Sequence, residues 1–152
     1  MALKLALKEI TLTTDGACLG NPGPGGWACL LRSGPHYREL YGCAVHTTNN
    51  RMELTAAIEG VRAIKQPCQL TIVTDSEYLR QGITEWINGW KRNGWMTKDK
   101  QPVKNKELWM ALEEALGPHD VRWQWVKGHA DHPDNNRADK LATDAAKLQI
   151  EC

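Results

Sequence analysis

Two aspartates follow short apolar, β-branched stretches in nearly the same local sequence. Asp15 lies in residues 13–16 (TTDG) and Asp75 in residues 73–76 (VTDS). If the two stretches are neighbouring parallel strands, both carboxylates lie at the carboxyl end of a sheet, where open α/β sheets place their sites. Carboxylates in close approach repel each other and favour a bound cation. Oxygen ligands without a His/Cys cluster favour magnesium or manganese over zinc. For either aspartate alone, a turn or a helix cap is the alternative.

The elements that would position these aspartates alternate between strands and helices. Their chain order is three strands, a helix, a strand, helices, a strand and a helix, which predicts a mixed α/β sheet with helices on its faces. The predicted strands are 9–14, 27–31, 37–45, 70–74 and 121–126, and the predicted helices are 52–65, 77–82, 84–91, 106–116 and 135–149. A Pro/Gly turn is expected at 21–26 and a loop at 127–134.

Apolar spacing predicts the buried face of two helices. Leu54, Ile58 and Val61 share one face of the first helix. On the last helix, the inward residues are expected to be Leu141, Ala145 and Leu148.

Length and composition indicate one domain, residues 1–152, that is cytoplasmic. The 152 residues are 41% hydrophobic and 24% charged, which is ordinary for a globular protein. No apolar run is long enough for a membrane helix, and the first eight residues do not make a secretory signal. The five cysteines are widely spaced, so reduced thiols are favoured over disulfides or a zinc site.

Charge is concentrated in one segment. Residues 81–106 carry six basic and two acidic side chains, whereas the whole chain has a net charge of +1. Such a basic patch suits a polyanionic partner. Trp86, Trp90 and Trp95 lie within it. Core packing is the favoured role for Trp90 and for Trp109 further along the chain.

Five motifs give the sequence a specific resemblance. The motifs are 14–26 (TDGACLGNPGPGG), 47–54 (TTNNRMEL), 74–76 (TDS), 125–130 (WVKGHA) and 135–139 (NNRAD). In order and spacing they resemble bacterial type 1 ribonuclease H, from about residue 9 to residue 148. The resemblance implies a ribonuclease H-like fold, in which helices flank a mixed five-stranded sheet.

The resemblance also implies an activity. A protein of this kind is an endoribonuclease that hydrolyses the RNA strand of RNA–DNA hybrids, leaving 5′-phosphate and 3′-hydroxyl ends. Asp15, Glu53, Asp75 and Asp139 would hold two Mg²⁺ ions, for which Mn²⁺ can substitute, and His129 would assist proton transfer or product release. Without the family, Glu53 and Asp139 would be interpreted as solvated helix residues, and His129 as an exposed loop histidine.

Contacts to the hybrid are implied for a further set of side chains. They are Cys18, Asn21, Thr48, Asn49, Asn50, Glu77, Trp86, Lys91 and Asn135. Helix capping is the alternative for Asn49 and Asn50, and the two roles are compatible. His132 precedes a proline and is expected to be structural.

Glu77 departs from the family pattern. It occupies a place where this family usually carries an amide that touches the substrate. A carboxylate there would repel phosphate, so we expect altered substrate affinity or an extra weak metal ligand.

Three other classes fit part of the pattern. A related nuclease of the same fold, such as an integrase, transposase or junction resolvase, would lack this basic segment and the Thr-Asn-Asn motif. A binding module for hybrids or single strands would not need four acids. An unrelated magnesium phosphohydrolase would explain only the two strand-end aspartates. No long apolar heptad is present, so a monomer is expected. No small-molecule cofactor is expected either.

Overall fold

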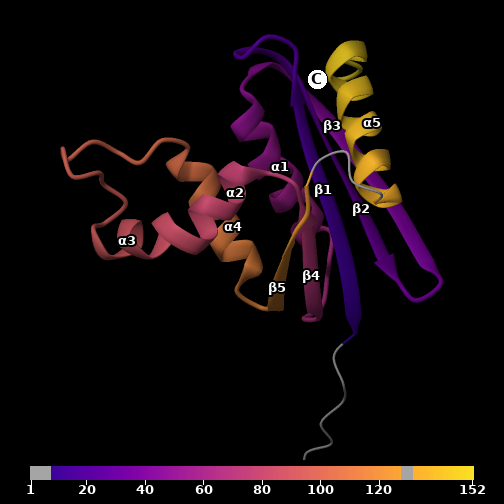
Figure 1. The fold of residues 1–152 in the computed structure, drawn as a ribbon, viewed down its shortest axis with the longest axis horizontal. Helices are drawn as coiled ribbons and strands as arrows, with labels where there is room; N and C mark the ends of the chain where they lie inside the picture. Colours follow the sequence, from indigo (N-terminus) through magenta and orange to yellow (C-terminus); the bar gives the residue numbers. More distant parts are fainter. Residues whose placement is uncertain (1–7, 128–131) are drawn as a thin grey trace, which may run out of the picture.

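Five strands form a single mixed sheet in the computed structural model, which describes residues 8–127 and 132–152. The strands are β1 (Glu9–Cys18), β2 (Gly23–Ser33), β3 (His36–Thr47), β4 (Gln69–Thr74) and β5 (Asp120–Trp125). Their spatial order is β3-β2-β1-β4-β5 (Figure 1). The pairs β1–β2 and β2–β3 are antiparallel, and β1–β4 and β4–β5 are parallel. The predicted mixed α/β fold is therefore confirmed.

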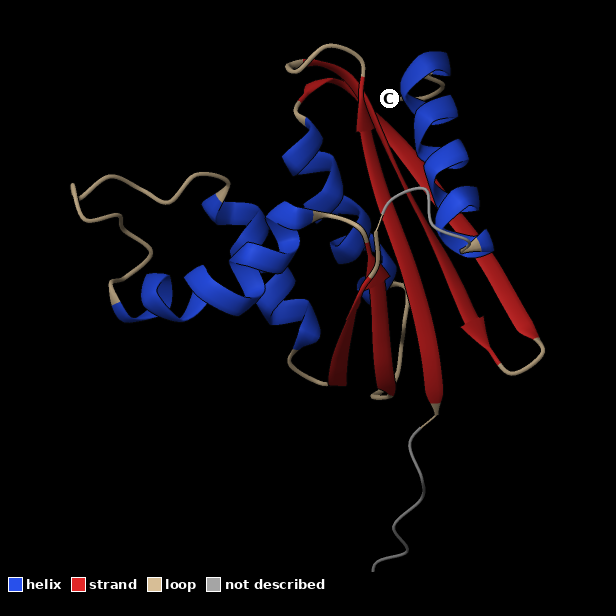
Figure 2. Ribbon diagram, in the orientation of Figure 1, coloured by secondary structure: helices blue, strands red, loops and turns tan. Residues whose placement is uncertain are grey.

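Helices cover both faces of this sheet (Figure 2). They are α1 (Asn49–Arg62), α2 (Glu77–Gln81), the π-helical segment η1 (Gly82–Trp86), α3 (Ile87–Arg92), α4 (Lys106–Leu116) and α5 (Pro133–Leu148). Figure 1 shows α1 to α4 on one side of the sheet and α5 on the other. Within the described residues, no helix is both long and apolar enough to cross a membrane.

Helix α1 begins earlier than its apolar spacing predicts, because Thr48 caps it. The Thr48 hydroxyl accepts a hydrogen bond from the Arg51 amide at 3.2 Å, which satisfies one of the free amides of the first turn. The predicted inward residues Leu54, Ile58 and Val61 are all buried. The capped start fixes where α1 begins, one turn before Glu53.

A continuous helical stretch from α2 to α3 replaces the two helices expected there. Its π-helical turn begins at Gly82, where a Cβ would lie 2.0 Å from the Trp109 ring. Only glycine lets the backbone approach this ring. Trp109 is fully buried, which confirms its core assignment, whereas Trp90 is half-buried and packs edge-on against it at 5.5 Å.

Strand β2 starts at Gly23, inside the stretch that the sequence predicts as a turn. The glycines serve packing as well as turning. A Cβ on Gly26 would lie 2.2 Å from the Ala142 carbonyl oxygen and 2.5 Å from the Ala146 amide nitrogen, both on α5. The backbones of β2 and α5 are therefore in close contact.

This close contact also explains why the predicted inward face of α5 is only partly right. The fully buried apolar residues are Ala138, Ala142 and Ala146, whereas Leu148 is 65% exposed. A helix lying directly on glycine backbone leaves room there only for methyl side chains, so Leu141 is half-buried and Leu148 faces outward.

One cysteine pair corrects the expectation of reduced thiols. Cys43 on β3 and Cys152 at the chain end form a disulfide with Cα atoms 5.3 Å apart, although 109 positions separate them in the sequence. Spacing could not reveal the pair, because α5 carries the chain end back to β3. The remaining cysteines, Cys18, Cys29 and Cys68, are free.

Two bidentate ion pairs dock the first half of α5 on the sheet. Arg32 of β2 donates to both carboxylate oxygens of Asp134 at 2.6 and 3.0 Å. Arg137 donates to both oxygens of Glu39, on β3, at 2.7 and 3.0 Å. Paired donors fix orientation better than a single contact does. The ion pairs therefore help to set the position of the α5 turn that carries Asp139.

The Glu39 pair predicts a pH-dependent stability difference. Hydrogen bonds from Arg137, and then from the Tyr37 hydroxyl, lower the pKa of Glu39 from 4.5 to about 2. A carboxylate with a lowered folded-state pKa stabilises the fold above its unfolded pKa and loses that contribution as pH falls through its folded pKa. Glu39→Gln is expected to cost about 0.5–1 kcal/mol in urea unfolding at neutral pH, with the difference shrinking as pH falls from 4.5 towards 2.

A matched variant tests this interpretation. Glu114 is an exposed glutamate of α4 that makes no ion pair with another described residue. Glu114→Gln should leave stability nearly unchanged across the same pH series. A Glu39→Gln penalty that stays constant with pH would show that the contact is not electrostatic.

Candidate active site

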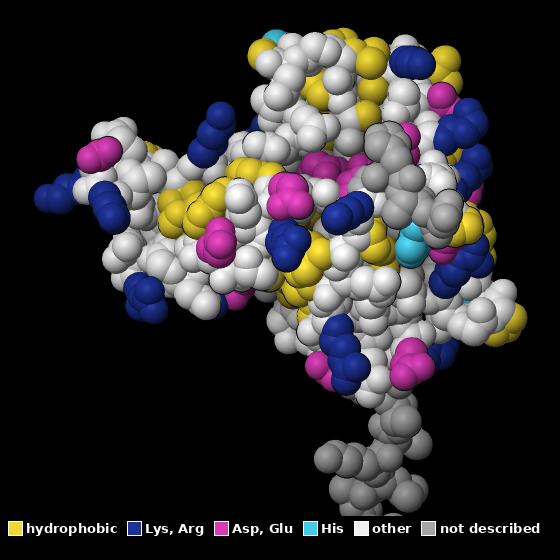
Figure 3. Space-filling model, in the orientation of Figure 1, with side chains coloured by type: hydrophobic (Ala, Val, Ile, Leu, Met, Phe, Trp, Pro, Cys, Tyr) yellow, Lys and Arg dark blue, Asp and Glu magenta, His cyan; other side chains and the backbone are white. Residues whose placement is uncertain are grey.

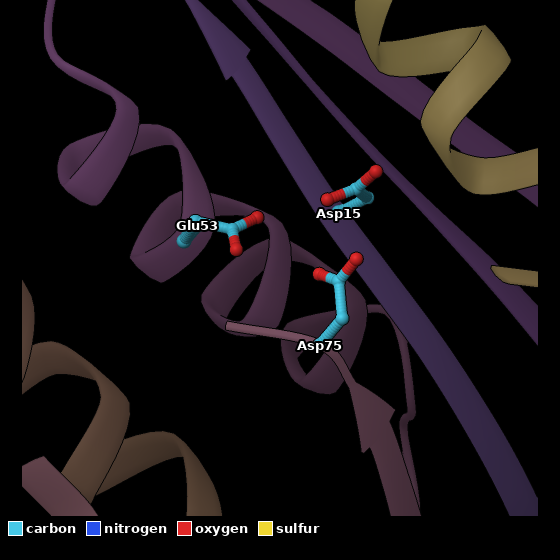
Figure 4. Close-up of side chains that lie close together, drawn as sticks. All are labelled: Asp15, Glu53 and Asp75. Atoms are coloured by element: carbon cyan, nitrogen blue, oxygen red, sulfur yellow. The ribbon is translucent and has the colours of Figure 1, made fainter. Parts of the chain in front are cut away.

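Three carboxylates converge at the edge of the sheet where β4 ends. Asp15 comes from β1, Asp75 directly follows β4, and Glu53 comes from the second turn of α1. One oxygen from each lies within 4.8 Å of the others, and Figure 4 shows the side chains pointing toward one another. Strands β1 and β4 pair in parallel with Thr13 opposite Val73, so the aspartates two residues further on emerge together. The juxtaposition predicted for Asp15 and Asp75 is confirmed.

Glu53 joins the two aspartates because α1 lies against β1 at a glycine. A Cβ on Gly16 would lie 2.6 Å from the Glu53 amide nitrogen and 2.9 Å from its Oε1 atom. Any larger residue at position 16 would push α1 away from the strand at Met52 and Glu53. Gly16 also donates its amide to Asp15 Oδ1 at 2.9 Å.

Burial makes this cluster costly without a counter-charge. Asp15 is 5% exposed and Glu53 is 4% exposed. Burial, followed by the charges of Glu53, Asp75 and Asp139, raises the pKa of Asp15. Burial, followed by the charge of Asp75, raises the pKa of Glu53. The carboxylates therefore destabilise one another when all are ionised.

The donor set fits a hard divalent cation. The oxygen Oε1 of Glu53 is buried and has no hydrogen-bond partner among the described residues, although buried polar atoms normally have one. The rest of the pocket lining is Gly16, Asn49, Asn50, Ser76, Glu77 and Tyr78. Oxygen ligands of this kind suit magnesium or manganese. Figure 3 shows acidic side chains gathered in a hollow on this face.

Two further predicted catalytic residues lie outside this group of three. Asp139 is exposed on α5, and its carboxyl approaches Asp15 closely enough to raise the pKa of that residue. His129 lies outside the residues that the structure describes. The neighbouring His132 is structural as expected, since its Nδ1 accepts the Asn135 amide and caps α5.

The predicted substrate contacts near α1 combine capping with access to the pocket. Asn21 Oδ1 accepts a hydrogen bond from the Asn49 amide at 3.0 Å. Asn21 and Thr48 therefore each provide an acceptor for a free backbone amide at the start of α1. Asn49 and Asn50 line the acidic pocket. Cys18, half-buried at the end of β1, directs its thiol to the Gly20 carbonyl at 3.0 Å.

The other predicted contacts lie in different environments. Glu77 is exposed on the pocket lining, and half-buried Trp86 packs edge-on against Tyr78 at 6.0 Å. Lys91 is exposed but forms an ion pair with Glu113 at 2.6 Å. Asn135 is only 2% exposed, and its Oδ1 has no partner within the described chain.

Sequence reasoning missed Ser76 and Tyr78. The Ser76 hydroxyl caps α2 by accepting the Leu79 amide at 3.1 Å, and Ser76 limits the rise in the pKa of Glu53. Tyr78 lines the pocket, while its hydroxyl accepts hydrogen bonds from Asn105 and Trp109 at 3.1 and 3.0 Å. A serine directly before a helix was the available signal for Ser76. The role of Tyr78 depends on contacts distant in sequence.

A second, larger concave region at the opposite end of the sheet does not compete as a metal site. Its lining includes Lys8, Arg38 and Lys65 and contains no acidic side chain. It therefore offers no carboxylate to a hard cation.

Comparison with known proteins agrees with this geometry. The family model described as RNase H matches residues 7–147. The ribonuclease H of Solibacter usitatus is 60% identical over 143 residues, covering 94% of this chain and 98% of that protein. The ribonuclease H of Hydrogenovibrio crunogenus is 60% identical over 139 residues, covering 91% and 96% respectively.

A solved structure shows the same likeness. The crystal structure of LC9-RNase H1, a type 1 RNase H with the type 2 active-site motif, superposes with a TM-score of 0.87 at 33% identity, covering 97% of this chain and 76% of that one. Sequence, fold and acidic cluster agree. The chain therefore belongs to the ribonuclease H family, the metal-dependent endoribonucleases that cut the RNA strand of RNA–DNA hybrids.

Proposed function

We propose that this chain hydrolyses the RNA strand of RNA–DNA hybrids with two Mg²⁺ ions, leaving 5′-phosphate and 3′-hydroxyl ends. Asp15, Glu53, Asp75 and Asp139 would hold the ions, and Mn²⁺ could replace Mg²⁺. The observation that carries the proposal is the convergence of three carboxylates, two of them buried, in one pocket. LC11-RNase H1, whose structure was solved in complex with an RNA/DNA hybrid, shares the fold at a TM-score of 0.71.

The proposed chemistry divides between ions and side chains. When bound, two metal ions supply an activated water and stabilise the leaving oxygen. Asp15 has Glu53, Asp75 and Asp139 around it, so these four carboxylates would hold the ions together. Ser76 shares the pocket lining with Glu53 and limits the rise in the pKa of that carboxyl. We assign proton transfer at the scissile phosphate, or release of product, to His129.

Substrate recognition would use two surfaces. Asn49 and Asn50 bring amides to the pocket, where they can read 2′-hydroxyls, which A-form helices expose in a wide minor groove. Trp86 and the lysines of residues 81–106 would contact the DNA strand, making binding weaken with salt. Lys91 would first have to leave Glu113. Cys18, Asn21, Thr48 and Asn135 complete the proposed contacts.

Cleavage of a labelled hybrid tests the proposal directly. With Mg²⁺, we expect the RNA strand alone to be cut, while duplex RNA and duplex DNA stay intact. EDTA should abolish cleavage, because the carboxylates cannot activate water unaided. End-group analysis should find 5′-phosphates.

The same experiment separates the rival classes. Tight, salt-sensitive binding of the hybrid without cleavage at any Mg²⁺ or Mn²⁺ concentration would indicate a binding module. Cleavage of duplex DNA would indicate a related nuclease of this fold. Because the four proposed ligands all lie on one chain, we infer that the enzyme works as a monomer, which sedimentation would test.

A further inference from the structure

Glu77 adds a fourth carboxylate to the pocket that holds Asp15, Glu53 and Asp75. It is the first residue of α2, directly after the capping Ser76. Its side chain is exposed and lines the pocket. Its oxygens are not among those that lie within 4.8 Å of one another. Glu77 is therefore placed at the rim, beside the cluster rather than in it.

We propose that Glu77 is a specificity-determining residue that strengthens cation binding at this pocket and weakens binding of the hybrid's phosphates in the absence of cation. The inference rests on the proposed function, since it concerns the same pocket and substrate. It deepens that function by making the order of binding matter. The cation is favoured first, and the nucleic acid follows.

Unbalanced negative charge inside the pocket supports this role. Glu53 Oε1 is buried without a hydrogen-bond partner among the described residues, and the pocket lining includes no lysine or arginine. A cation thus provides charge compensation that the chain itself does not supply there. A rim carboxylate raises the local cation concentration further.

The rim position suits contact through water. Mg²⁺ gives up its water reluctantly and usually keeps several water ligands when bound to protein. The Glu77 carboxylate can accept hydrogen bonds from such waters without entering the cluster. The amides of Asn49 and Asn50 on the same lining are neutral and do not offset its charge.

For a phosphate, the sign of the effect reverses. A phosphodiester entering the pocket without cation meets Glu77 in addition to the three clustered carboxylates. The repulsion between exposed charges is modest and screened by salt. Glu77 should therefore weaken metal-free hybrid binding most at low ionic strength.

The alternative is a purely structural role. An acidic residue in the first turn stabilises a helix through the helix dipole, and Glu77 occupies that place in α2. Such a role would change thermal stability but not cation affinity. The two roles are separable because Glu77→Asp keeps the charge while Glu77→Gln removes it.

Titration of Mg²⁺ into substrate-free protein, followed by calorimetry, is the primary measurement. Glu77→Gln is expected to weaken Mg²⁺ binding by roughly three- to ten-fold, while Glu77→Asp stays near wild type. In EDTA, fluorescence anisotropy should show Glu77→Gln binding the hybrid roughly two- to five-fold more tightly at low salt. Glu114→Gln removes the same charge from an exposed position outside the pocket and should change neither affinity. Circular dichroism checks that every variant is folded.

Several outcomes would overturn the inference. Equal Mg²⁺ affinity in wild type and Glu77→Gln would do so, as would an equal loss in Glu77→Gln and Glu114→Gln. Unchanged or weaker hybrid binding by Glu77→Gln in EDTA would contradict the claim that Glu77 repels the hybrid's phosphates in the absence of cation. Neither readout requires catalysis. A wild-type protein that binds Mg²⁺ and hybrid but does not cleave would refute the proposed function and leave this comparison valid.

Discussion

Asp15→Asn is expected to lower hybrid cleavage by at least about a thousand-fold and, at the same time, to make the metal-free protein more stable. The activity falls because Asp15 is the carboxylate that has Glu53, Asp75 and Asp139 around it. An amide cannot replace its charge toward a cation. The shape of the side chain is preserved, so the loss would report on chemistry rather than folding.

Stability is expected to rise because the buried carboxylates repel one another. Asp15 is almost fully buried beside Glu53 and Asp75. The asparagine oxygen can still accept the Gly16 amide, and its NH₂ group can donate to the neighbouring carboxylates. We expect a gain of about 1–2 kcal/mol in EDTA at neutral pH.

Two measurements check these effects together. Cleavage rates with Mg²⁺ give the activity, and urea unfolding in EDTA gives the free energy of unfolding. Asp120→Asn, at the exposed start of β5, is the control and should leave both nearly unchanged. Substantial cleavage by Asp15→Asn would remove Asp15 from the catalytic set. Loss of activity without added stability would mean that the carboxylates do not strain the fold.

The central pair of this site was predictable from strands alone. Residues 13–16 and 73–76 end alike, and parallel pairing of β1 with β4 places Asp15 and Asp75 together. Glu53 was not predictable in this way, because a glutamate in the first turn of a helix is usually solvated. Its burial depends on the missing side chain of Gly16, a contact between segments far apart in sequence.

Long-range contacts also account for the errors. The glycines before Trp27 resemble a turn, yet Gly26 belongs to β2 and contacts α5. That contact shifts the inward face of α5 to Ala138, Ala142 and Ala146. Residues 81–106 contain exposed lysines, and they also contain Trp90, which packs against the buried Trp109. The segment is therefore partly core and partly surface.

Gly26→Ala should connect this packing to catalysis without altering any carboxylate. The added methyl would meet backbone atoms of α5, at Ala142 and Ala146, so the helix itself has to move. We expect a loss of about 2–3 kcal/mol in the free energy of unfolding. Asp139 lies on the same helix, one turn before Ala142, and would shift away from Asp15.

The kinetic consequence distinguishes positioning from general damage. A displaced catalytic group can cost roughly ten- to a hundred-fold in rate. The expected loss is larger in kcat than in KM, because the basic residues 81–106 lie on the other side of the sheet from α5 (Figure 1) and Asn135 is the one proposed substrate contact on that helix. Single-turnover cleavage well below the unfolding temperature measures this loss on folded protein.

Gly89→Ala is the matched control, since no heavy atom lies within 4 Å of the added Cβ on α3. Alanine there should raise stability by about 0.5–1 kcal/mol and leave kcat unchanged. If Gly26→Ala lost stability but kept its full kcat, the exact position of α5 on the sheet would not matter to the reaction. Asp139 would then be dispensable for the chemical step, and the site would reduce to the three converging carboxylates. A loss of kcat would instead show that glycine at position 26 is required because it lets a helix bring the fourth acid to the other three.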